Sequence, residues 1–484
     1  MMKILSKNGD ELIFLGMDSD VANKGDYLLI EDSKNKRKMV VQIYDEDYLS
    51  SQTLIEDIVK DEIVSASSEQ NFHDPLNISS LSRLIRDARV FKAKIRSTID
   101  ISGKLSSELD WIPSRVYSSI RRLSMVELST LLDRKGSLPI NIGKSGKMNE
   151  DFVIYAEDLD GKLNIITGRK ESGKSHLSKV LIKSLVEHGA YVIVFDLNRE
   201  YQGLGLTIDG KPSEINDKVI LLEPGTSMRF NLNYCGKSAI TNVLRNTLDI
   251  TSASLREFLR IWERLENNGD LNIESLGNLI NRANMNELVR DALVSRFHTL
   301  KSSNLFSADS EDGLMFEQIC KRKSSGAAFV INLQKASSVT RKIIVELVLS
   351  KMVDLLERSL IKPIFLFAEE AHLYVKDTYW EDIITRMRHF GIFTTFVTNQ
   401  PDALSDGIYR QVDNIFLFNF INDSDLEKIS RVSLIDTETV KSVVRTLPQR
   451  NCLIIGKVVR QMPIVMNIKG ADMMVYGETR KFFT

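Results

Sequence analysis

One glycine-rich loop constrains the fold of this chain more than any other feature, and it reads Gly168-Arg169-Lys170-Glu171-Ser172-Gly173-Lys174-Ser175. The loop matches GxxxxGK[ST] in full, follows the apolar run 163–167 and opens the segment 175–188, whose apolar residues recur at helical spacing. In such a strand, loop and helix, the backbone N–H groups of the loop and the helix start point toward a bound phosphate. The sequence therefore predicts a phosphate-binding loop for a nucleotide.

The residue types of the loop predict how it holds the nucleotide. Lys174 is expected to reach the β- and γ-phosphates, and Ser175 is expected to ligate Mg²⁺. A second Gly-Lys-Ser, at 143–145, is rejected because Leu138 stands where the first glycine is needed and because the segment is expected to be a loop. The residues expected to line the nucleotide are Gly168, Arg169, Lys170, Glu171, Ser172, Gly173, Lys174, Ser175 and His176.

Further apolar runs follow the loop and alternate with helical segments. Continuous apolar strands separated by helices indicate a parallel sheet that is covered on both faces. Between about 237 and 323 the sequence is helical and polar, which predicts a lobe inserted into the sheet domain. The expected strands are 191–195, 328–333, 363–368, 393–398 and 414–418.

Two adjacent acids, Glu369 and Glu370, end the expected strand 363–368. In P-loop enzymes one acid at this place acts on Mg²⁺ through a water, and the next orients or deprotonates the attacking water. Glu369 is therefore a candidate for the metal site together with Ser175, and Glu370 is a candidate catalytic acid. The alternative is a pair of solvated acids that open a helix and are favoured by its dipole.

Polar residues near the ends of other strands add candidates. Gln400 follows the run 393–398 and can contact the γ-phosphate, although Asn-Gln before a proline could equally form only a turn. Arg386 and Arg388 lie between the acids and this strand, and either could stabilise the transferring charge as an arginine finger or simply be solvated on a helix. Asp196 ends the strand 191–195, where it could face the ligand or cap a helix.

The residues before about 149 are expected to form a separate β-rich unit. The runs 27–30 and 39–44 flank the polar stretch 31–38, which predicts a hairpin. These pieces fit a small barrel, so the predicted domains are 1–148 and 149–484. The run 90–96 alternates as a half-buried strand does, with Phe91, Ala93 and Ile95 on one face and Lys92, Lys94 and Arg96 on the other.

Composition narrows the class of protein. A chain of 484 residues is too long for one ordinary core, and without an apolar run of about 18 residues we expect no membrane span and a cytoplasmic protein. A formal net charge of −1 argues against wrapping nucleic acid over the outer surface, but permits a ring with a basic lining. Residues 83–122 hold ten Lys/Arg and four Asp/Glu, which predicts either a docking or DNA-facing surface or an ordinary solvated face.

Taken in order, the motifs GRKESGKS, FDLNREY, LFAEEAHLY, RHFGI, TNQP and LPQRNCLIIGKVVRQMPIVMNI resemble the HerA family of hexameric DNA-pumping ATPases, which is related to FtsK. The resemblance implies an α/β, RecA-like P-loop NTPase domain with a helical insertion, preceded by a small N-terminal β-barrel of the HAS-barrel type. It also implies ATP and Mg²⁺ as cofactors, double-stranded DNA as the substrate track, and a homo-hexameric ring.

Carried over to this sequence, the resemblance assigns ATP and Mg²⁺ binding to Lys174 and Ser175, and catalysis to Glu370 beside Glu369. It makes Gln400 the sensor of the γ-phosphate and Arg388 the preferred arginine finger. Lys162 falls where relatives often carry an arginine that reaches the neighbouring subunit's nucleotide, but lysine lacks the planar fork of arginine.

One departure from the family pattern lies in the loop itself. Relatives usually carry Thr-Gly-Ser where this chain has Lys170-Glu171-Ser172, so Glu171 replaces a glycine that approaches the phosphates and adds a negative charge. Lys170 is expected to offset part of that charge. The departure predicts a nucleotide affinity or turnover below that of typical relatives.

Family members commonly pair with a nuclease, NurA in archaea, or with defence effectors in some bacterial systems. The expected function is therefore an ATP-driven DNA translocase or helicase that feeds DNA to a partner, in end processing, repair or phage defence. Two alternatives stay open: a conjugation- or secretion-type ATPase, and a scaffold ring with weak turnover that serves an effector.

Overall fold

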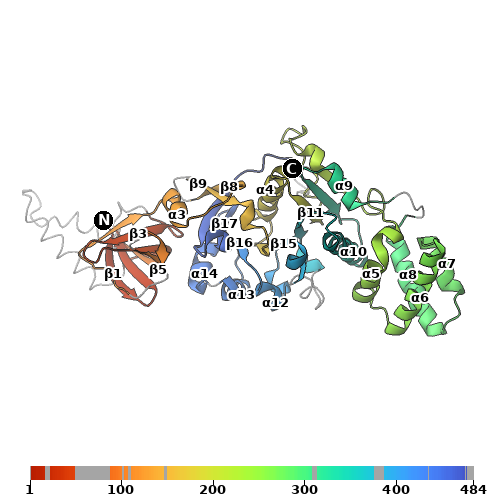
Figure 1. The fold of residues 1–484 in the computed structure, drawn as a ribbon. Coiled ribbons are helices and arrows are strands. Elements are labelled where there is room, and N and C mark those ends of the chain that lie inside the picture. Colours follow the sequence, from red (N-terminus) through yellow and green to blue (C-terminus); the bar gives the residue numbers. More distant parts are fainter. Residues whose placement is uncertain are drawn as a thin grey trace, which may run out of the picture. The chain divides into compact units, whose positions relative to one another are not determined.

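The computed structural model of the chain divides into two compact units (Figure 1). The first unit comprises Met1–Lys135, Gly143–Val153 and Leu417–Ile468, and the second comprises Gly136–Ile142, Ile154–Phe416 and Lys469–Thr484. The structure describes residues 2–16, 22–49, 88–100, 103–106, 111–145, 150–307, 313–374, 386–433, 435–474 and 476.

An antiparallel sheet forms the N-terminal part of the first unit. The predicted hairpin is confirmed, because β3 (Tyr27–Asp32) and β4 (Arg37–Tyr48) pair antiparallel from Tyr27↔Gln42 to Asp32↔Arg37. Asp32 shapes its turn by accepting hydrogen bonds from the backbone N–H groups of Lys34 and Asn35, both at 3.0 Å. Closure into a barrel stays a prediction. The sheet runs β1 (Lys3–Asn8), β2 (Glu11–Gly16), β5 (Arg89–Ile99), β4 (Arg37–Tyr48), β3 (Tyr27–Asp32), β7 (Ser118–Arg122), with β6 (Leu105–Ser106) beside β5.

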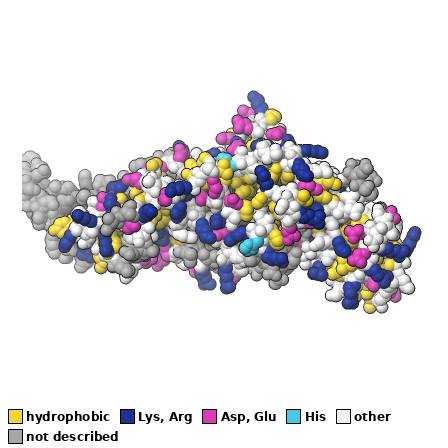
Figure 2. All heavy atoms as spheres, viewed as in Figure 1, with side chains coloured by type: hydrophobic (Ala, Val, Ile, Leu, Met, Phe, Trp, Pro, Cys, Tyr) yellow, Lys and Arg dark blue, Asp and Glu magenta, His cyan; other side chains and the backbone are white. Residues whose placement is uncertain are grey.

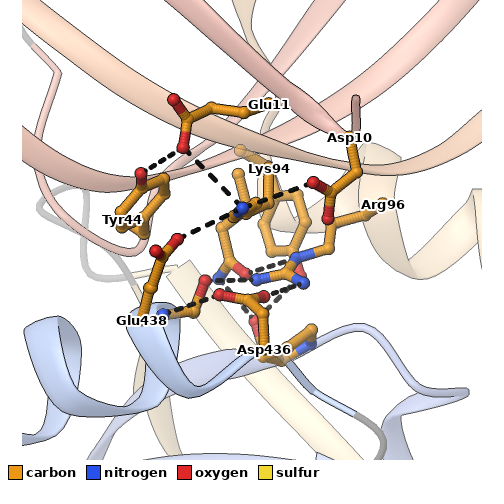
Figure 3. Close-up of polar contacts among 11 residues, drawn as sticks. Asp10, Glu11, Tyr44, Lys94, Arg96, Asp436 and Glu438 are labelled. Carbon is orange, nitrogen blue, oxygen red and sulfur yellow. Dashed lines mark hydrogen bonds and ion pairs between the residues drawn. The ribbon is translucent and has the colours of Figure 1, made fainter. Parts of the chain in front are cut away.

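The polar face of β5 differs from the expectation. Phe91, Ala93 and Ile95 are buried in the core as predicted, but Lys94 is also buried, and the Arg96 side chain is only 10% exposed. The reason is a polar cluster on that face, in which both cations are neutralised within the first unit (Figure 3).

In this cluster the Lys94 ammonium lies 3.3 Å from carboxylate oxygens of both Asp10 and Glu438. Arg96 contacts the Asp436 carboxylate at 2.9 Å and donates a hydrogen bond to the Thr439 hydroxyl at 2.8 Å. Asp436 is the N-cap of α14 (Thr437–Arg445), so the two cations attach this helix to the N-terminal sheet.

Other basic residues of the stretch 83–122 are also paired within the first unit. Lys92 lies 3.3 Å from Asp45, and Arg122 lies 3.0 Å from Asp26. The net charge of this stretch therefore overstates the unpaired cationic charge that it carries at the surface. Figure 2 shows basic and acidic side chains interspersed over the visible face of the molecule.

The first unit also contains the C-terminal strand pair. Strand β17 (Asn451–Gly456) pairs antiparallel with β18 (Ile464–Ile468), and β18 pairs with residues 143–145 of β8 (Pro139–Ser145). The Gly-Lys-Ser at 143–145 thus lies in a strand, and its expected placement in a loop was wrong. Its rejection as a phosphate cradle stands, because strand pairing occupies backbone groups that a phosphate would need. The other α-helices and strands described in this unit are α3 (Met125–Leu131), β9 (Glu150–Tyr155) and α13 (Asp423–Ser433).

A predominantly parallel sheet forms the centre of the second unit, as predicted from the apolar runs. The strand pairs β12–β13, β13–β11, β11–β14, β14–β15 and β15–β10 are all parallel. The sheet runs β12 (Val219–Leu222), β13 (Ala327–Asn332), β11 (Tyr191–Asp196), β14 (Ile364–Glu369), β15 (Ile392–Thr398), β10 (Asn164–Thr167) and β16 (Asn414–Phe418).

Helix α4 (Lys174–Glu187) packs against β10, β11, β13 and β15, so the helix after the glycine loop covers the middle of the sheet. Between β12 and β13 the chain is helical, and Figure 1 shows α5 to α8 grouped in a lobe of their own. Trp262 is fully buried, beside Phe258. The helices in this stretch are α5 (Leu232–Asn242), α6 (Ser252–Asn268), α7 (Ile273–Arg282), α8 (Glu287–Ser302) and α9 (Phe316–Arg322).

Two more α-helices are described in this unit: α10 (Ser338–Glu357), which precedes β14, and α12 (Asp406–Tyr409), which precedes β16. In the part of the chain that the structure describes, every helix is too short or too polar to cross a membrane.

Arg96→Met tests the attachment of α14. The change keeps an unbranched apolar stem but removes the guanidinium, which leaves the Asp436 carboxylate, 21% exposed, without its cation and should cost about 2–4 kcal/mol. The thermal unfolding midpoint should fall by several degrees. Lys38→Met is the matched control, because it removes a solvent-exposed ion pair with Glu31 from the same sheet and should change little. Equal effects of the two changes would contradict the attachment.

Candidate nucleotide-binding site

Strand register brings the predicted site residues of the second unit to one edge of the sheet. Thr167, the last residue before the glycine loop, is paired with Thr398, and Glu369 is paired with Val397 on the other side of β15. Since β10, β15 and β14 are parallel, their carboxyl ends lie together, and each is followed by a polar segment. The glycine loop, the two acids and Gln400 therefore leave the sheet at the same edge.

The loop has the backbone geometry that a phosphate cradle requires. Gly173 is the N-cap of α4 with φ 118°, a conformation that strongly favours glycine. Lys174 is buried, and its ammonium donates hydrogen bonds of 2.9 Å to the carbonyl oxygens of Gly168 and Arg169. Burial lowers the pKa of Lys174, while the nearby carboxylates of Glu369 and Glu370 oppose that effect. The lysine is thus folded back over the loop where phosphates would bind.

Glu369, the last residue of β14, connects this strand to α4, the helix after the glycine loop. Its side chain is 3% exposed, and the Ser175 hydroxyl donates to its Oε1 at 3.2 Å. The Tyr201 hydroxyl donates to its Oε2 at 2.7 Å. Burial, with the neighbouring charge of Glu200, raises the pKa of Glu369 to about 8. A hydroxyl and a carboxylate that converge at a helix start are oxygen donors of the kind that Mg²⁺ prefers.

Glu370 directly follows β14 at the same edge of the sheet. Its backbone has φ 49°, its side chain is 18% exposed, and burial raises its pKa. His372 Nδ1 lies 3.4 Å from Glu370 Oε2 and 3.1 Å from the Thr398 hydroxyl oxygen, which accepts a hydrogen bond from the backbone N–H of Gln400. The catalytic candidate and the sensor candidate are thus joined through a histidine and a threonine.

Buried polar atoms around the loop fit a polar ligand. The side-chain oxygens Thr167 Oγ1, Ser172 Oγ and Asn399 Oδ1 are buried without a hydrogen-bond partner in the described residues. Buried polar groups in proteins are otherwise almost always satisfied. Their position at the carboxyl ends of β10 and β15 is where phosphate oxygens and bound water would lie, so the residues present fit a magnesium nucleotide.

The role of Asp196, which two alternatives left open, is structural. It is fully buried, and its carboxylate accepts hydrogen bonds from the backbone N–H groups of Glu200, at 3.0 Å, and Tyr201, at 3.1 Å. Burial raises its pKa to about 6. Asp196 therefore shapes the turn after β11 and fixes the start of the segment that carries Tyr201.

The finger candidates lie at the opposite edge of the sheet, where the strands begin. Arg388 forms an ion pair with Asp413 at 2.7 Å, and Asp413 also accepts a hydrogen bond from the backbone N–H of Leu163, just before β10. Lys162 precedes the same strand. Neither residue is brought to the glycine loop of its own chain.

His176 follows the loop on α4, half-buried. Its Nε2 lies 2.7 Å from both the carbonyl oxygen of Lys469 and the backbone nitrogen of Ala471, so the segment after β18 borders the helix start. This contact joins His176 to residues 293 and 295 positions away and could not be predicted from the sequence. Tyr201 is the last residue of the motif FDLNREY (Asp-x-x-x-Glu-Tyr from Asp196), but the motif alone did not indicate what this tyrosine does.

Comparison with known proteins identifies relatives over most of the chain. Residues 166–353 match the family described as "Helicase HerA, central domain". The chain is 23% identical over 453 residues to the DNA double-strand break repair helicase HerA of Saccharolobus solfataricus, covering 85% of this chain and 86% of that protein. It is 24% identical to HerA of Sulfolobus acidocaldarius, covering 83% of this chain and 82% of that protein. The resemblance to the HerA family that the motifs carry is thus confirmed.

Solved structures with a similar fold include VirB4 of Thermoanaerobacter pseudethanolicus, with a TM-score of 0.50 and 16% identity, covering 69% of this chain and 96% of that chain. Another is the plasmid coupling protein TrwB with the ATP analogue ADPNP, with a TM-score of 0.53 and 14% identity, covering 73% of this chain and 94% of that chain. These similarities show a shared α/β fold built on a large sheet.

The loop position that departs from the family pattern gives a prediction. Glu171 is exposed and has φ 60°, in the left-handed region that glycine adopts at little cost. Glu171→Gly should lower the KM for ATP several-fold, because it removes a charge that repels the phosphates by roughly 1 kcal/mol and restores the freedom of the backbone. Steady-state ATP hydrolysis measures the change.

Glu171→Gln is the matched control, since it removes the charge but keeps the side chain. A gain in both variants assigns the defect to charge, and a gain in Glu171→Gly alone assigns it to the backbone. No gain in either variant would refute the idea that Glu171 weakens nucleotide binding.

Proposed function

We propose that this chain, a member of the HerA family, is an ATP hydrolase that moves along double-stranded DNA as a translocase or helicase. The observation that carries the proposal is the convergence of Lys174, Ser175, Glu369, Glu370 and Gln400 at one edge of the sheet. Its relatives over most of the chain are named as DNA double-strand break repair helicases. The motor domain is RecA-like in this proposal, and the N-terminal sheet is barrel-like.

The residues at this edge of the sheet can together bind the phosphates of ATP, hold the metal ion and activate the attacking water. Lys174 would exchange its carbonyl partners, Gly168 and Arg169, for β- and γ-phosphate oxygens. Ser175 and Glu369 would hold the magnesium ion, which supplies charge neutralisation when it is bound with ATP. Glu370 would orient the attacking water and accept its proton, and the pKa that burial raises makes its carboxylate a stronger base. Gln400 would report the γ-phosphate.

A ring accounts for the placement of the basic candidates. Arg388 and Lys162 lie at the edge where the strands begin, away from the glycine loop of their own chain. In a homo-hexamer with head-to-tail contacts, one subunit can present such residues to the nucleotide of the next. Arg388 is therefore the finger that acts between subunits, with Lys162 in a weaker supporting role.

The partner and the cellular process that we propose are those expected from the resemblance to the HerA family. A nuclease partner of the NurA type or a defence effector would cut the DNA that the ring delivers, in cytoplasmic end processing, repair or phage defence. A conjugation-type role is the second candidate, favoured only by the fold shared with VirB4 and TrwB. A scaffold ring with weak turnover is the third, favoured by the exposed charge of Glu171 in the loop.

The proposed activity predicts that duplex DNA stimulates ATP turnover by the wild-type protein. Glu370→Gln should bind ATP but hydrolyse it at least about a hundredfold more slowly, because the water loses its base. Phosphate release with and without duplex DNA measures both effects. If duplex DNA neither binds nor stimulates hydrolysis, the translocase proposal fails; undiminished turnover in Glu370→Gln would remove that residue from catalysis.

Mixed rings test the shared site. Arg388→Lys keeps a cation beside Asp413 but loses the planar fork, and Lys174→Ala cannot bind the phosphates, so each variant alone should be nearly inactive. When the two are mixed and reassembled, some interfaces combine an intact Lys174 with an intact Arg388 of the neighbour, and a measurable share of the ATPase activity should return. Mixtures that stay inactive would contradict a finger supplied between subunits.

A further inference from the structure

Two buried tyrosines donate hydrogen bonds to Glu369, one to its carboxylate and one to its backbone carbonyl oxygen. The Tyr201 hydroxyl donates to the carboxylate oxygen Oε2 at 2.7 Å. The Tyr374 hydroxyl donates to the backbone carbonyl oxygen of Glu369 at 2.8 Å. Both tyrosines are buried, and burial raises the pKa of each far above its ordinary value, so each stays a neutral donor. Only Tyr201 acts on the group that faces the loop.

The local structure keeps Tyr201 in this position. The Asp196 carboxylate accepts its backbone N–H at 3.1 Å, and Arg199 has φ 61° in the turn between them. The Lys179 ammonium, one helical turn beyond Ser175 on α4, lies 5.7 Å from the centre of the tyrosine ring. The aromatic ring is thus enclosed between the first turns of α4 and the turn after β11, with its hydroxyl directed at the carboxylate.

With Oε2 occupied by Tyr201, the other oxygen of Glu369 is turned to Ser175, whose hydroxyl is 3.2 Å away. A carboxylate with one oxygen anchored has little freedom to rotate. Outer partners of metal ligands commonly set ligand orientation in this way, and losing one costs about 10- to 100-fold in metal affinity or activity.

We propose that Tyr201 is a positioning residue of the magnesium site, which orients the Glu369 carboxylate so that Oε1 and the Ser175 hydroxyl face the ion together. The inference rests on the proposed part of Glu369 in that site. It gives the tyrosine of the Asp-x-x-x-Glu-Tyr motif a defined task, and it makes the length and direction of the turn after β11 a determinant of magnesium binding.

The test compares Tyr201→Phe with Tyr374→Phe. Each change removes one buried hydroxyl that donates a hydrogen bond to Glu369. In Tyr201→Phe the Mg²⁺ concentration for half-maximal ATP hydrolysis should rise about tenfold or more, with kcat at saturating Mg²⁺ within about threefold of wild type. Tyr374→Phe should leave the Mg²⁺ requirement nearly unchanged. A merely structural role would lower kcat or stability in both variants without this separation.

A binding measurement provides a second readout that needs no turnover. A fluorescent ADP analogue is titrated with and without Mg²⁺, and Tyr201→Phe should lose most of the gain in affinity that Mg²⁺ gives wild type, while its Mg²⁺-free affinity stays the same. Should Tyr201→Phe fail to fold, Asp196→Asn, which weakens the turn and keeps the hydroxyl, should show the same effect more weakly.

An unchanged Mg²⁺ requirement in Tyr201→Phe, or equal changes in the two phenylalanine variants, would overturn the inference. If Tyr201→Phe does not fold, an unchanged requirement in Asp196→Asn overturns it instead. All of these measurements are made without DNA, so failure of the translocase proposal leaves them intact. If the affinity of the wild-type protein for the ADP analogue does not change with Mg²⁺, the assignment of Ser175 and Glu369 to a magnesium site is itself refuted.

Discussion

The buried carboxylate of Glu369 is the contact on which the rest of the site depends. It joins β14 to the start of α4 through Ser175 and to the turn after β11 through Tyr201. Because its pKa is raised to about 8, this carboxyl stabilises the ligand-free fold below its ordinary pKa, and the contribution is lost as pH rises through the folded value. In the proposed magnesium site, a cation bound beside Glu369 would offset the cost of ionising this buried carboxyl.

Neutralisation of buried charge also organises the first unit. Lys94 and Arg96 point away from the apolar core of the N-terminal sheet, yet they are enclosed by acids that come from β1–β2 and from α14 (Figure 3). Opposite charges that leave water need such partners, since an unpaired buried charge is costly. Among the described residues of the stretch 83–122, Lys92, Lys94, Arg96 and Arg122 are therefore paired with acids of their own unit.

Local patterns made much of the fold predictable. Apolar runs located the strands of the parallel sheet, with β16 at Asn414–Phe418 as expected, and the glycine loop located the start of α4 within one residue. What could not be predicted depends on partners far away in the chain: Arg96 meets Asp436 across 340 positions, and Tyr201 meets Glu369 across 168. Alternation in β5 predicted a polar face but not the acids that cover it, and Gly-Lys-Ser at 143–145 could not be recognised as a strand without its partner β18.

The most direct test of the central claim, that hydrolysis at this site drives movement along duplex DNA, is displacement of a third strand from a DNA triplex. A protein that advances along the duplex should release the labelled third strand in the presence of ATP, and release should stop with Glu370→Gln or with a non-hydrolysable ATP analogue. Hydrolysis that duplex DNA stimulates, but that leaves the third strand in place, would contradict a translocase.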